Sequence, residues 1–215
     1  MKYLKLFEDF NDYDPYELMM IPPNKKAEMI MDEIRKDKPN LNLVRDLITL
    51  GADLDWQDKF GNTALHRCVN SNHPDIARML IDAGADVNMQ DDKRGQTALH
   101  ECVNSNHLDI ARMLIDAGAD VNIQDRGGST ALHRCAEQNR PEIVKMLIDA
   151  GADLNIQRND GFTALYVCAY WKNPEIARML IDAGADKTIP NNDGKLPYEL
   201  KISNDYRELK ELLQP

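Results

Sequence analysis

The sequence has few aromatic residues and no long hydrophobic run. Phe, Trp and Tyr make up 6% of its 215 residues, and no segment approaches the roughly 18 uninterrupted apolar residues that a membrane-spanning helix needs. The first ten residues lack the apolar stretch of a secretory signal and soon become acidic. We therefore expect a protein that neither spans a membrane nor carries a secretory signal.

Positive charge is also scarce. Lys and Arg number 26 against 36 Asp and Glu, which gives a formal net charge of -10 at pH 7. Proteins bind the phosphate backbone of nucleic acids through Lys and Arg side chains that release counterions. The acidic balance therefore argues against nucleic acid as a partner, although it does not by itself identify a basic one.

Motifs of known catalytic chemistry are missing as well. The sequence has no glycine-rich phosphate loop, no nucleophile elbow and no paired carboxylates outside the pattern described next. We predict no catalytic site, no cofactor and no enzymatic activity.

What the sequence does contain is a strong internal repeat. The segments Thr63–Gln90 and Thr97–Gln124 differ at only three positions, which are Arg67/Glu101, Pro74/Leu108 and Met89/Ile123. Two further copies begin at Thr130 and Thr163, so that the four threonines are 34, 33 and 33 residues apart. A repeat of this length indicates an array of stacked supersecondary units.

Each copy predicts two short helices. Thr63 is suited to cap the first helix, and Asn72 can adopt the left-handed conformation that ends it. Pro74 suits the first position of a second helix, which Gly84 would close. Apolar residues recur at helical spacing in both segments, for example Ala64, Leu65, Cys68 and Val69, then Ile76, Ala77, Leu80 and Ile81. One copy has no core of its own, so the copies must stack as a solenoid.

The pattern resembles the ankyrin repeat. Its opening motif appears as Asp58, followed by Gly61-Asn62-Thr63-Ala64-Leu65-His66, and its closing motif as Gly84-Ala85-Asp86-Val87-Asn88. The resemblance implies an all-α solenoid of helix-turn-helix units with protruding β-turn fingers. It divides the chain into an N-terminal aromatic and acidic segment (1–24), an N-terminal capping repeat (25–57), four full repeats (58–90, 91–124, 125–157, 158–190) and a C-terminal capping repeat (191–215).

The sequence departs from the family motif at three places. Ala stands in all four full copies where the motif has Pro, and Tyr166 replaces the motif histidine in the fourth copy. Lys172 stands where the turn between the helices usually has Gly, which predicts local strain or a shifted turn there.

The recurring cysteines and histidines fit structural roles. Four cysteines occupy one repeat position (Cys68, Cys102, Cys135, Cys168). Stacked layers lie roughly 8–10 Å apart, which exceeds disulfide reach, and zinc sites need closely paired ligands. We expect free, buried thiols without metal, in a reducing compartment such as the cytoplasm. His66, His100 and His133 resemble the family's structural histidine, bonded to the threonine hydroxyl and to turn backbone.

The resemblance also implies where a partner protein binds. In ankyrin-repeat proteins the turn tips and the exposed end of the first helix face the partner. Carried over, the tips are Lys59, Phe60 and Asn62; Lys93, Arg94 and Gln96; Arg126, Gly127 and Ser129; and Asn159, Asp160 and Phe162. The helix positions are Asn70-Ser71, Asn104-Ser105, Glu137-Gln138 and Tyr170-Trp171.

The last helix pair differs in character from the others. Tyr170 and Trp171 are aromatic where the equivalent residues are polar, and exposed Tyr and Trp dominate many binding hot spots. The alternative is that the pair packs on the C-terminal cap. We take Tyr170 and Trp171 as the predicted anchor for the partner.

The segment 1–24 leaves two alternatives open. Leu4, Phe7, Phe10, Tyr13 and Tyr16 recur every three residues before two prolines. The segment is either a short helix that packs on the first repeat or a peptide that docks elsewhere.

Three functions follow from these observations. The first is a protein-binding adaptor or inhibitor that is monomeric on its own. The second is an assembly component that docks into a larger complex through the segment 1–24. The third, a nucleic-acid or small-ligand binder, is disfavoured by charge and by the lack of an obvious pocket. Asn88, Asn122 and Asn155 also resemble ankyrin asparagines that hydroxylases modify in animal cells, which makes them candidate modification sites.

Overall fold

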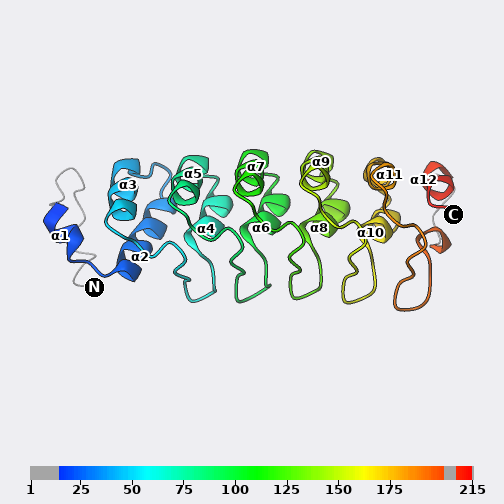
Figure 1. Ribbon diagram of the computed structural model, residues 1–215, viewed down its shortest axis with the longest axis horizontal. Coiled ribbons are helices and arrows are strands. Elements are labelled where there is room, and N and C mark those ends of the chain that lie inside the picture. The colour runs from blue at the N-terminus through cyan, green and yellow to red at the C-terminus, as the bar shows by residue number, and fades with distance from the viewer. Residues whose placement is uncertain (1–14, 201–206, 215) are drawn as a thin grey trace.

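The computed structural model describes residues 15–200 and 207–214, and these residues form helices and loops without a strand. Figure 1 shows two rows of helices in an elongated stack, with long loops that project from the lower side as fingers. The two ends of the chain lie at opposite ends of the stack. The all-α solenoid with protruding fingers that the sequence predicted is confirmed. None of the helices described is long and apolar enough to cross a membrane.

The helices alternate between the two rows along the chain. The first helix of each full repeat lies in one row, as α4 (Ala64–Ser71), α6 (Ala98–Ser105), α8 (Ala131–Gln138) and α10 (Ala164–Trp171). The second helices form the other row, as α5 (Pro74–Asp82), α7 (Leu108–Asp116), α9 (Pro141–Asp149) and α11 (Pro174–Asp182). Each helix contacts the equivalent helix of the next repeat. We call the surface of the first helices together with the fingers the inner face.

The predicted caps form the helix ends. In α4 the Thr63 hydroxyl lies 2.9 Å from His66 Nδ1, and the Thr63 backbone N–H donates to the same nitrogen at 3.2 Å. Asn72 ends α4 with φ 53°, as predicted. Lys172 ends α10 with φ 62°, so the fourth turn is not shifted and Lys172 adopts the same left-handed conformation.

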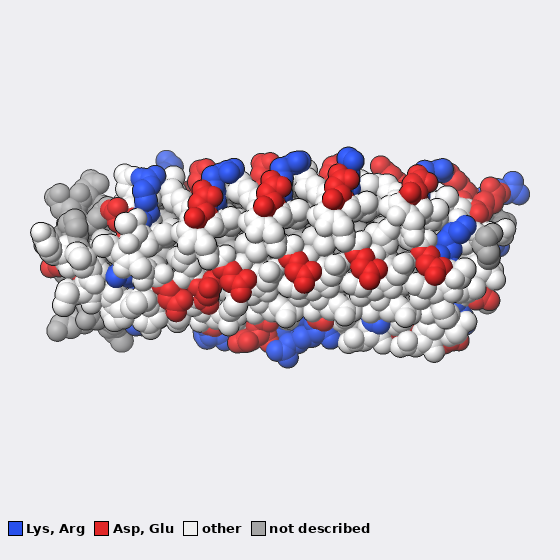
Figure 2. Space-filling model, in the orientation of Figure 1, with Lys and Arg blue, Asp and Glu red and all other residues white. Residues whose placement is uncertain are grey.

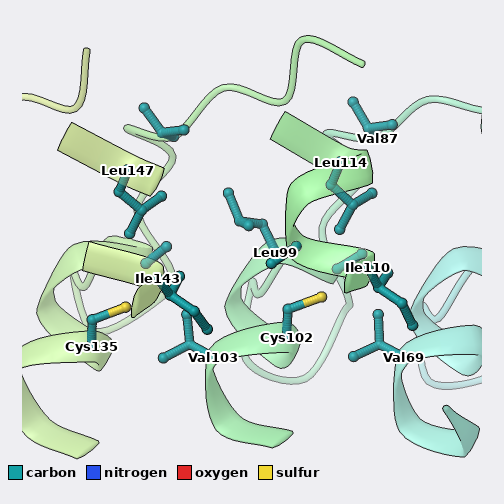
Figure 3. Packing of buried hydrophobic residues seen from close by; sticks show 14 of the residues in the cluster. Val69, Val87, Leu99, Cys102, Val103, Ile110, Leu114, Cys135, Ile143 and Leu147 are labelled. Atoms are coloured by element: carbon teal, nitrogen blue, oxygen red, sulfur yellow. The ribbon is translucent and has the colours of Figure 1, made fainter. Parts of the chain in front are cut away.

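The core runs through the stack without interruption. Figure 3 shows Val69 of α4 pointing toward Ile110 of α7, and Val103 of α6 pointing toward Ile143 of α9. These residues are buried members of one hydrophobic cluster. A first helix therefore packs on the second helix of the next repeat, and this arrangement requires stacking.

The cysteines are part of this core. Cys68, Cys102, Cys135 and Cys168 are each fully buried and free, and Figure 3 shows Cys102 and Cys135 among the aliphatic side chains. Burial raises the pKa of each thiol above its ordinary value. The thiols are therefore protonated at neutral pH and act as small apolar side chains.

Further helices cover the two ends of the array. The N-terminal end has α1 (Pro15–Met19), α2 (Pro23–Ile34) and α3 (Leu41–Thr49). Helix α2 begins two residues before the predicted start of the capping repeat. Leu18 and Ile21 are buried in the core cluster, so this part of the segment 1–24 packs on the array as a helix. Leu4, Phe7, Phe10 and Tyr13 lie outside the described residues. The C-terminal end has η2 (Pro197–Glu199) and α12 (Arg207–Leu212).

Candidate functional site

The fingers form a continuous row because their backbones are hydrogen-bonded to one another. The N–H of Asp92 donates to Phe60 O at 3.1 Å, and the N–H of Arg126 donates to Arg94 O at 2.8 Å. The N–H of Asn159 continues the row by donating to Gly127 O at 3.1 Å. Consecutive finger tips are therefore held in fixed register.

A glutamine at the start of each finger adds a second set of links. Gln90 Nε2 donates to Gly95 O of its own finger at 2.5 Å and to Gln124 O of the next repeat at 3.0 Å. The same pair of hydrogen bonds, one within the finger and one to the next repeat, occurs at Gln57, Gln124 and Gln157. A partner that contacts the fingers meets a surface ordered before binding, which lowers the entropy cost of association.

The aspartates of the fingers point their oxygens at their own turns. Asp91 Oδ1 accepts from the N–H groups of Lys93 and Arg94 at 2.7 and 2.6 Å, and Oδ2 accepts from the N–H of Gln96 at 2.9 Å. Asp58 and Asp125 make equivalent bonds. These carboxylates form the turn, because their oxygens face its N–H groups and not the solvent at the tips.

Two of these aspartates are also paired with an arginine of the first helix. Arg134 Nη2 donates to Asp125 Oδ2 at 2.5 Å, and Arg67 pairs with Asp58 in the same way. Burial raises the pKa of Asp58 and Asp125, but the arginine and the backbone N–H groups outweigh burial and hold both pKa values below the ordinary range. Each pair fastens a finger to the helix that follows it.

The repeated histidines fasten each helix to the next finger. His66 Nε2 lies 3.0 Å from Gln96 O, His100 Nε2 lies 3.0 Å from Ser129 O, and His133 Nε2 lies 3.0 Å from Phe162 O. Burial lowers the pKa of all three imidazoles, that of His133 to about 4. These neutral, hydrogen-bonded rings have the structural role that the resemblance implied.

Gln96 is a correction to the predicted contact surface. Its side chain is 2% exposed, because it lies at the base of the finger, directly before the helix cap Thr97, and not at the tip. The N–H of Asp91 donates to Gln96 O at 2.8 Å and closes the finger there. Asn62, Ser129 and Phe162 occupy the equivalent position, and all three are at least partly buried. The tips themselves are one to three residues earlier in each finger.

The aromatic residues at the end of α10 are exposed. Tyr170 is 57% and Trp171 50% exposed, and their ring centroids are 5.7 Å apart in an edge-on arrangement. Tyr170 also contacts Phe162, with centroids 6.1 Å apart. Phe162 in turn lies 4.1 Å from the ring of buried Tyr166. The exposed pair is thus the outer end of an aromatic chain that starts in the core.

Tyr166 also replaces the histidine link of the other repeats. Its hydroxyl accepts from Asn191 Nδ2 at 3.1 Å, so the fourth repeat is fastened to the next finger through a phenol in place of an imidazole. The sequence marked Tyr166 as a departure but did not show this bond, because the partner lies 25 residues away.

The equivalent positions in the other repeats are polar, as the sequence predicted. Asn70, Ser71 and Ser105 are exposed, and Asn104, Glu137 and Gln138 are partly buried. Gln138 Nε2 donates to Asn104 Oδ1 of the preceding repeat at 2.6 Å. These side chains line a hydrophilic inner face that ends at the aromatic pair. Lys59, Phe60 and Arg94 are exposed at the tips as predicted.

Glu101 is a residue whose environment the sequence did not reveal. It stands where the flanking repeats have Arg67 and Arg134, so Asp91 faces a carboxylate instead of an arginine. Glu101 Oε2 is buried without a hydrogen-bond partner. Burial and, to a lesser extent, the charge of Asp91 raise the pKa of Glu101 to about 7. The Arg67/Glu101 difference between near-identical copies was the available signal.

The turn asparagines link neighbouring repeats. Asn88 Oδ1 accepts from the N–H of Asp120 at 2.8 Å, and Asn122 and Asn155 make the equivalent bond to the next repeat. Among the described residues no cluster of three or more His, Cys, Asp or Glu is arranged to hold a metal ion. The chemistry that this arrangement offers is noncovalent contact along an ordered inner face.

Comparisons with known proteins agree on the repeat. The model for ankyrin repeats matches residues 31–125 and 118–191. The human Neurogenic locus notch homolog protein 2 is 43% identical over 61 residues, which are 28% of this chain and 2% of that protein. The human Protein phosphatase 1 regulatory subunit 27 is 43% identical over 53 residues, which are 25% of this chain and 34% of that protein. The chain therefore spans only a small part of each of these relatives.

Proposed function

Because this chain belongs to the ankyrin-repeat family, we propose that it binds another protein through the inner face of its solenoid, as a non-catalytic adaptor or inhibitor. The observation that carries the proposal is the exposure of Tyr170 and Trp171 at the end of α10. One relative is itself named as a regulatory subunit, which is a role of this kind.

The aromatic pair is well suited to anchor a partner. The fold does not require aromatic residues there, since the first two repeats have Asn-Ser and the third has Glu-Gln at the same positions. The ring of Phe162 contacts the ring of Tyr170. Because this contact already restricts the Tyr170 side chain, less of its freedom is lost on binding. Large aromatic side chains contribute much contact area for little rotamer entropy.

The test replaces the pair with the residues of the first two repeats. The variant Tyr170→Asn/Trp171→Ser should fold, because the last two residues of α10 are then the same as those of α4 and α6. Loss of a hot spot costs on the order of 2 kcal/mol or more, which is about a thirtyfold loss of affinity. Affinity capture from the native source should therefore recover a partner with the parent chain but not with the variant.

A matched control tests whether the loss of any exposed aromatic side chain would give the same result. Tyr16, in α1, is 79% exposed and lies at the far end of the stack from α10. The variant Tyr16→Ser should capture the partner as the parent chain does. If the α10 variant binds normally, or unfolds at a clearly lower temperature than the parent chain, the aromatic anchor is wrong.

A role as an assembly component docked through the N-terminal segment is the second candidate. The exposed side chains of Tyr16, Met19 and Met20 favour it, since they gather apolar surface at one end of the molecule. The variant Tyr16→Ser/Met19→Ser/Met20→Ser removes this surface and keeps the buried Leu18 and Ile21. If this variant loses its place in a complex while the α10 variant keeps it, the assembly role is correct.

A further inference from the structure

Charge is divided between the two sides of the molecule. Each second helix of a full repeat has an acidic residue in its first turn, an acidic residue at its end and a single basic residue between them, as in Asp75, Arg78 and Asp82. An exposed aspartate follows in each closing motif, at Asp86, Asp120, Asp153 and Asp186. Figure 2 shows acidic residues recurring in a line across this face. Much of the negative charge therefore lies away from the inner face.

The tips of the first three fingers expose basic side chains. We call the exposed side chains of Lys59, Lys93, Arg94 and Arg126 the basic edge. Figure 2 shows basic residues, with some acidic ones among them, at the lower border of the molecule, where Figure 1 places the fingers. Among the described residues none of the four forms an ion pair, since the salt bridges found involve other cations.

The aspartates of these fingers are drawn back into the turns. Asp91 and Asp125 are buried and accept N–H groups of their own turns, and Asp125 is also paired with Arg134 of the following helix. The basic side chains of the edge are exposed, although Arg126 Nη2 also donates to Asp92 O of the preceding finger at 2.6 Å. Only Asp92 adds an exposed carboxylate to these three tips. The fourth finger lacks this excess, because Arg158 is paired with Asp160.

We propose that the basic edge binds an acidic segment of the partner protein, which continues from an apolar residue anchored at Tyr170 and Trp171. This inference rests on the proposed function, and it adds the chemistry and the direction of the partner. The acidic segment would run along the finger tips from the fourth repeat toward the first.

The dimensions suit a short peptide segment. Stacked repeats are roughly 10 Å apart, so the first and fourth fingers are about 30 Å apart, and an extended chain covers that distance with about nine residues. A longer polyanion such as a nucleic acid would extend beyond the few cations toward a molecule of net charge -10. Charge complementarity on this scale favours an acidic protein segment and a fast, salt-dependent association.

The test uses a fluorescein-labelled peptide of ten glutamates and measures its fluorescence anisotropy at low ionic strength. The parent chain should bind it, and a peptide of ten glutamines should not bind. The variant Lys93→Glu/Arg94→Glu should weaken binding about tenfold or more, which corresponds to about 1.4 kcal/mol. Salt near 0.15 M should weaken the binding of the parent chain, because exposed charges are then screened beyond about 8 Å.

The matched control changes the same charge on the opposite side. Arg78 and Arg112 are exposed on α5 and α7, and Arg78→Glu/Arg112→Glu should alter the affinity less than about twofold. The inference is overturned if this control loses as much affinity as the edge variant, if the edge variant binds normally, or if ten nucleotides of single-stranded RNA bind more tightly than the glutamate peptide.

The same peptide distinguishes this inference from the proposed function. It has no apolar residue, so Tyr170→Asn/Trp171→Ser should bind it as the parent chain does. A partner that needs the aromatic pair but tolerates Lys93→Glu/Arg94→Glu would overturn the acidic segment alone and leave the proposed function standing.

Discussion

At the residue scale, the turn between the two helices of the fourth repeat is the least favourable of its kind. Asn72, Asn106 and Asn139 adopt positive φ in the first three full repeats, whereas the fourth has Lys172 with φ 62°. Asn tolerates this region better than Lys, because its short polar side chain can hydrogen-bond locally. We expect Lys172→Asn to raise the free energy of unfolding by about 0.5–1 kcal/mol. A urea unfolding midpoint that stays the same or falls would contradict this.

Two glycines allow the cost of backbone strain to be measured separately from the cost of a steric clash. Gly61 and Gly84 have φ 78° and 87°, so an alanine is strained by a similar amount at either position. A Cβ at Gly61 would lie 2.1 Å from Asp92 N in the next finger, whereas one at Gly84 would meet nothing within 4 Å. We expect Gly84→Ala to lower the free energy of unfolding by about 1–2 kcal/mol and Gly61→Ala to lower it further. Equal losses in urea unfolding would show that the fingers do not pack as described.

Glu101 makes the second repeat sensitive to pH. Its pKa is near 7 in the folded protein against an ordinary value of 4.5, so the folded state holds this proton more tightly than the unfolded chain does. The stability from this group is therefore fully present below about pH 4.5 and is lost as the pH rises toward 7. One pKa unit corresponds to about 1.4 kcal/mol, so the rise from 4.5 to about 7 corresponds to a loss of about 3 kcal/mol once the pH is above 7.

The neutral variant Glu101→Gln isolates this effect. His100 and His133 have lowered pKa values, which make the protein more stable as the pH rises through a similar window, so the parent chain alone does not report on Glu101. The difference in melting temperature between Glu101→Gln and the parent chain should grow in favour of the variant from pH 4.5 to pH 7.5. A difference that is constant across this range would refute the assignment.

At the scale of elements, α1 belongs to the folded array. Leu18 is fully buried, whereas Tyr16 on the same helix is 79% exposed. Large-to-small changes at a buried leucine cost about 2–5 kcal/mol, and exposed changes usually stay within about 0.5 kcal/mol. Leu18→Ala should therefore lower the melting temperature clearly, and Tyr16→Ala should not. Similar behaviour of the two variants would mean that α1 does not pack as described.

The helices of the full repeats could be predicted from the sequence because their signals are local. Thr63, Asn72 and Pro74 each act on the backbone within one turn, and the copies repeat the same signals. The bases of the fingers could not be assigned in this way. Gln96 and Phe162 were taken as tip residues, but burial there depends on the neighbouring repeat, to which no local pattern refers.

The candidate site likewise has features that could be predicted from local sequence and features that depend on contacts between elements. The polar and aromatic characters of the helix ends are visible in the sequence, and the exposure of Tyr170 and Trp171 agrees with that interpretation. The contact of Tyr170 with Phe162 and the bond from Asn191 to Tyr166 join residues of different elements. The neighbours of Glu101 likewise come from other elements, so its raised pKa required the structure.

At the scale of the whole molecule, the residues that stabilise the stack are different from those that we expect to bind a partner. The buried cysteines, the histidine links and the interlocked fingers are repeated and support the array. The residues that differ between copies are concentrated on the inner face, where Tyr170 and Trp171 follow three polar pairs. A molecule of this kind presents one ordered, elongated surface, and the central claim is that a partner protein occupies it.

Site-specific photo-crosslinking in the native source tests that claim most directly. A photoreactive phenylalanine analogue is placed either at Trp171 on the inner face or at Arg112 on the opposite side, both of which are exposed. The account predicts that the chain labelled at position 171 crosslinks to a distinct partner protein, and that the chain labelled at position 112 does not. Crosslinking of that protein from position 112 and not from position 171 would contradict it.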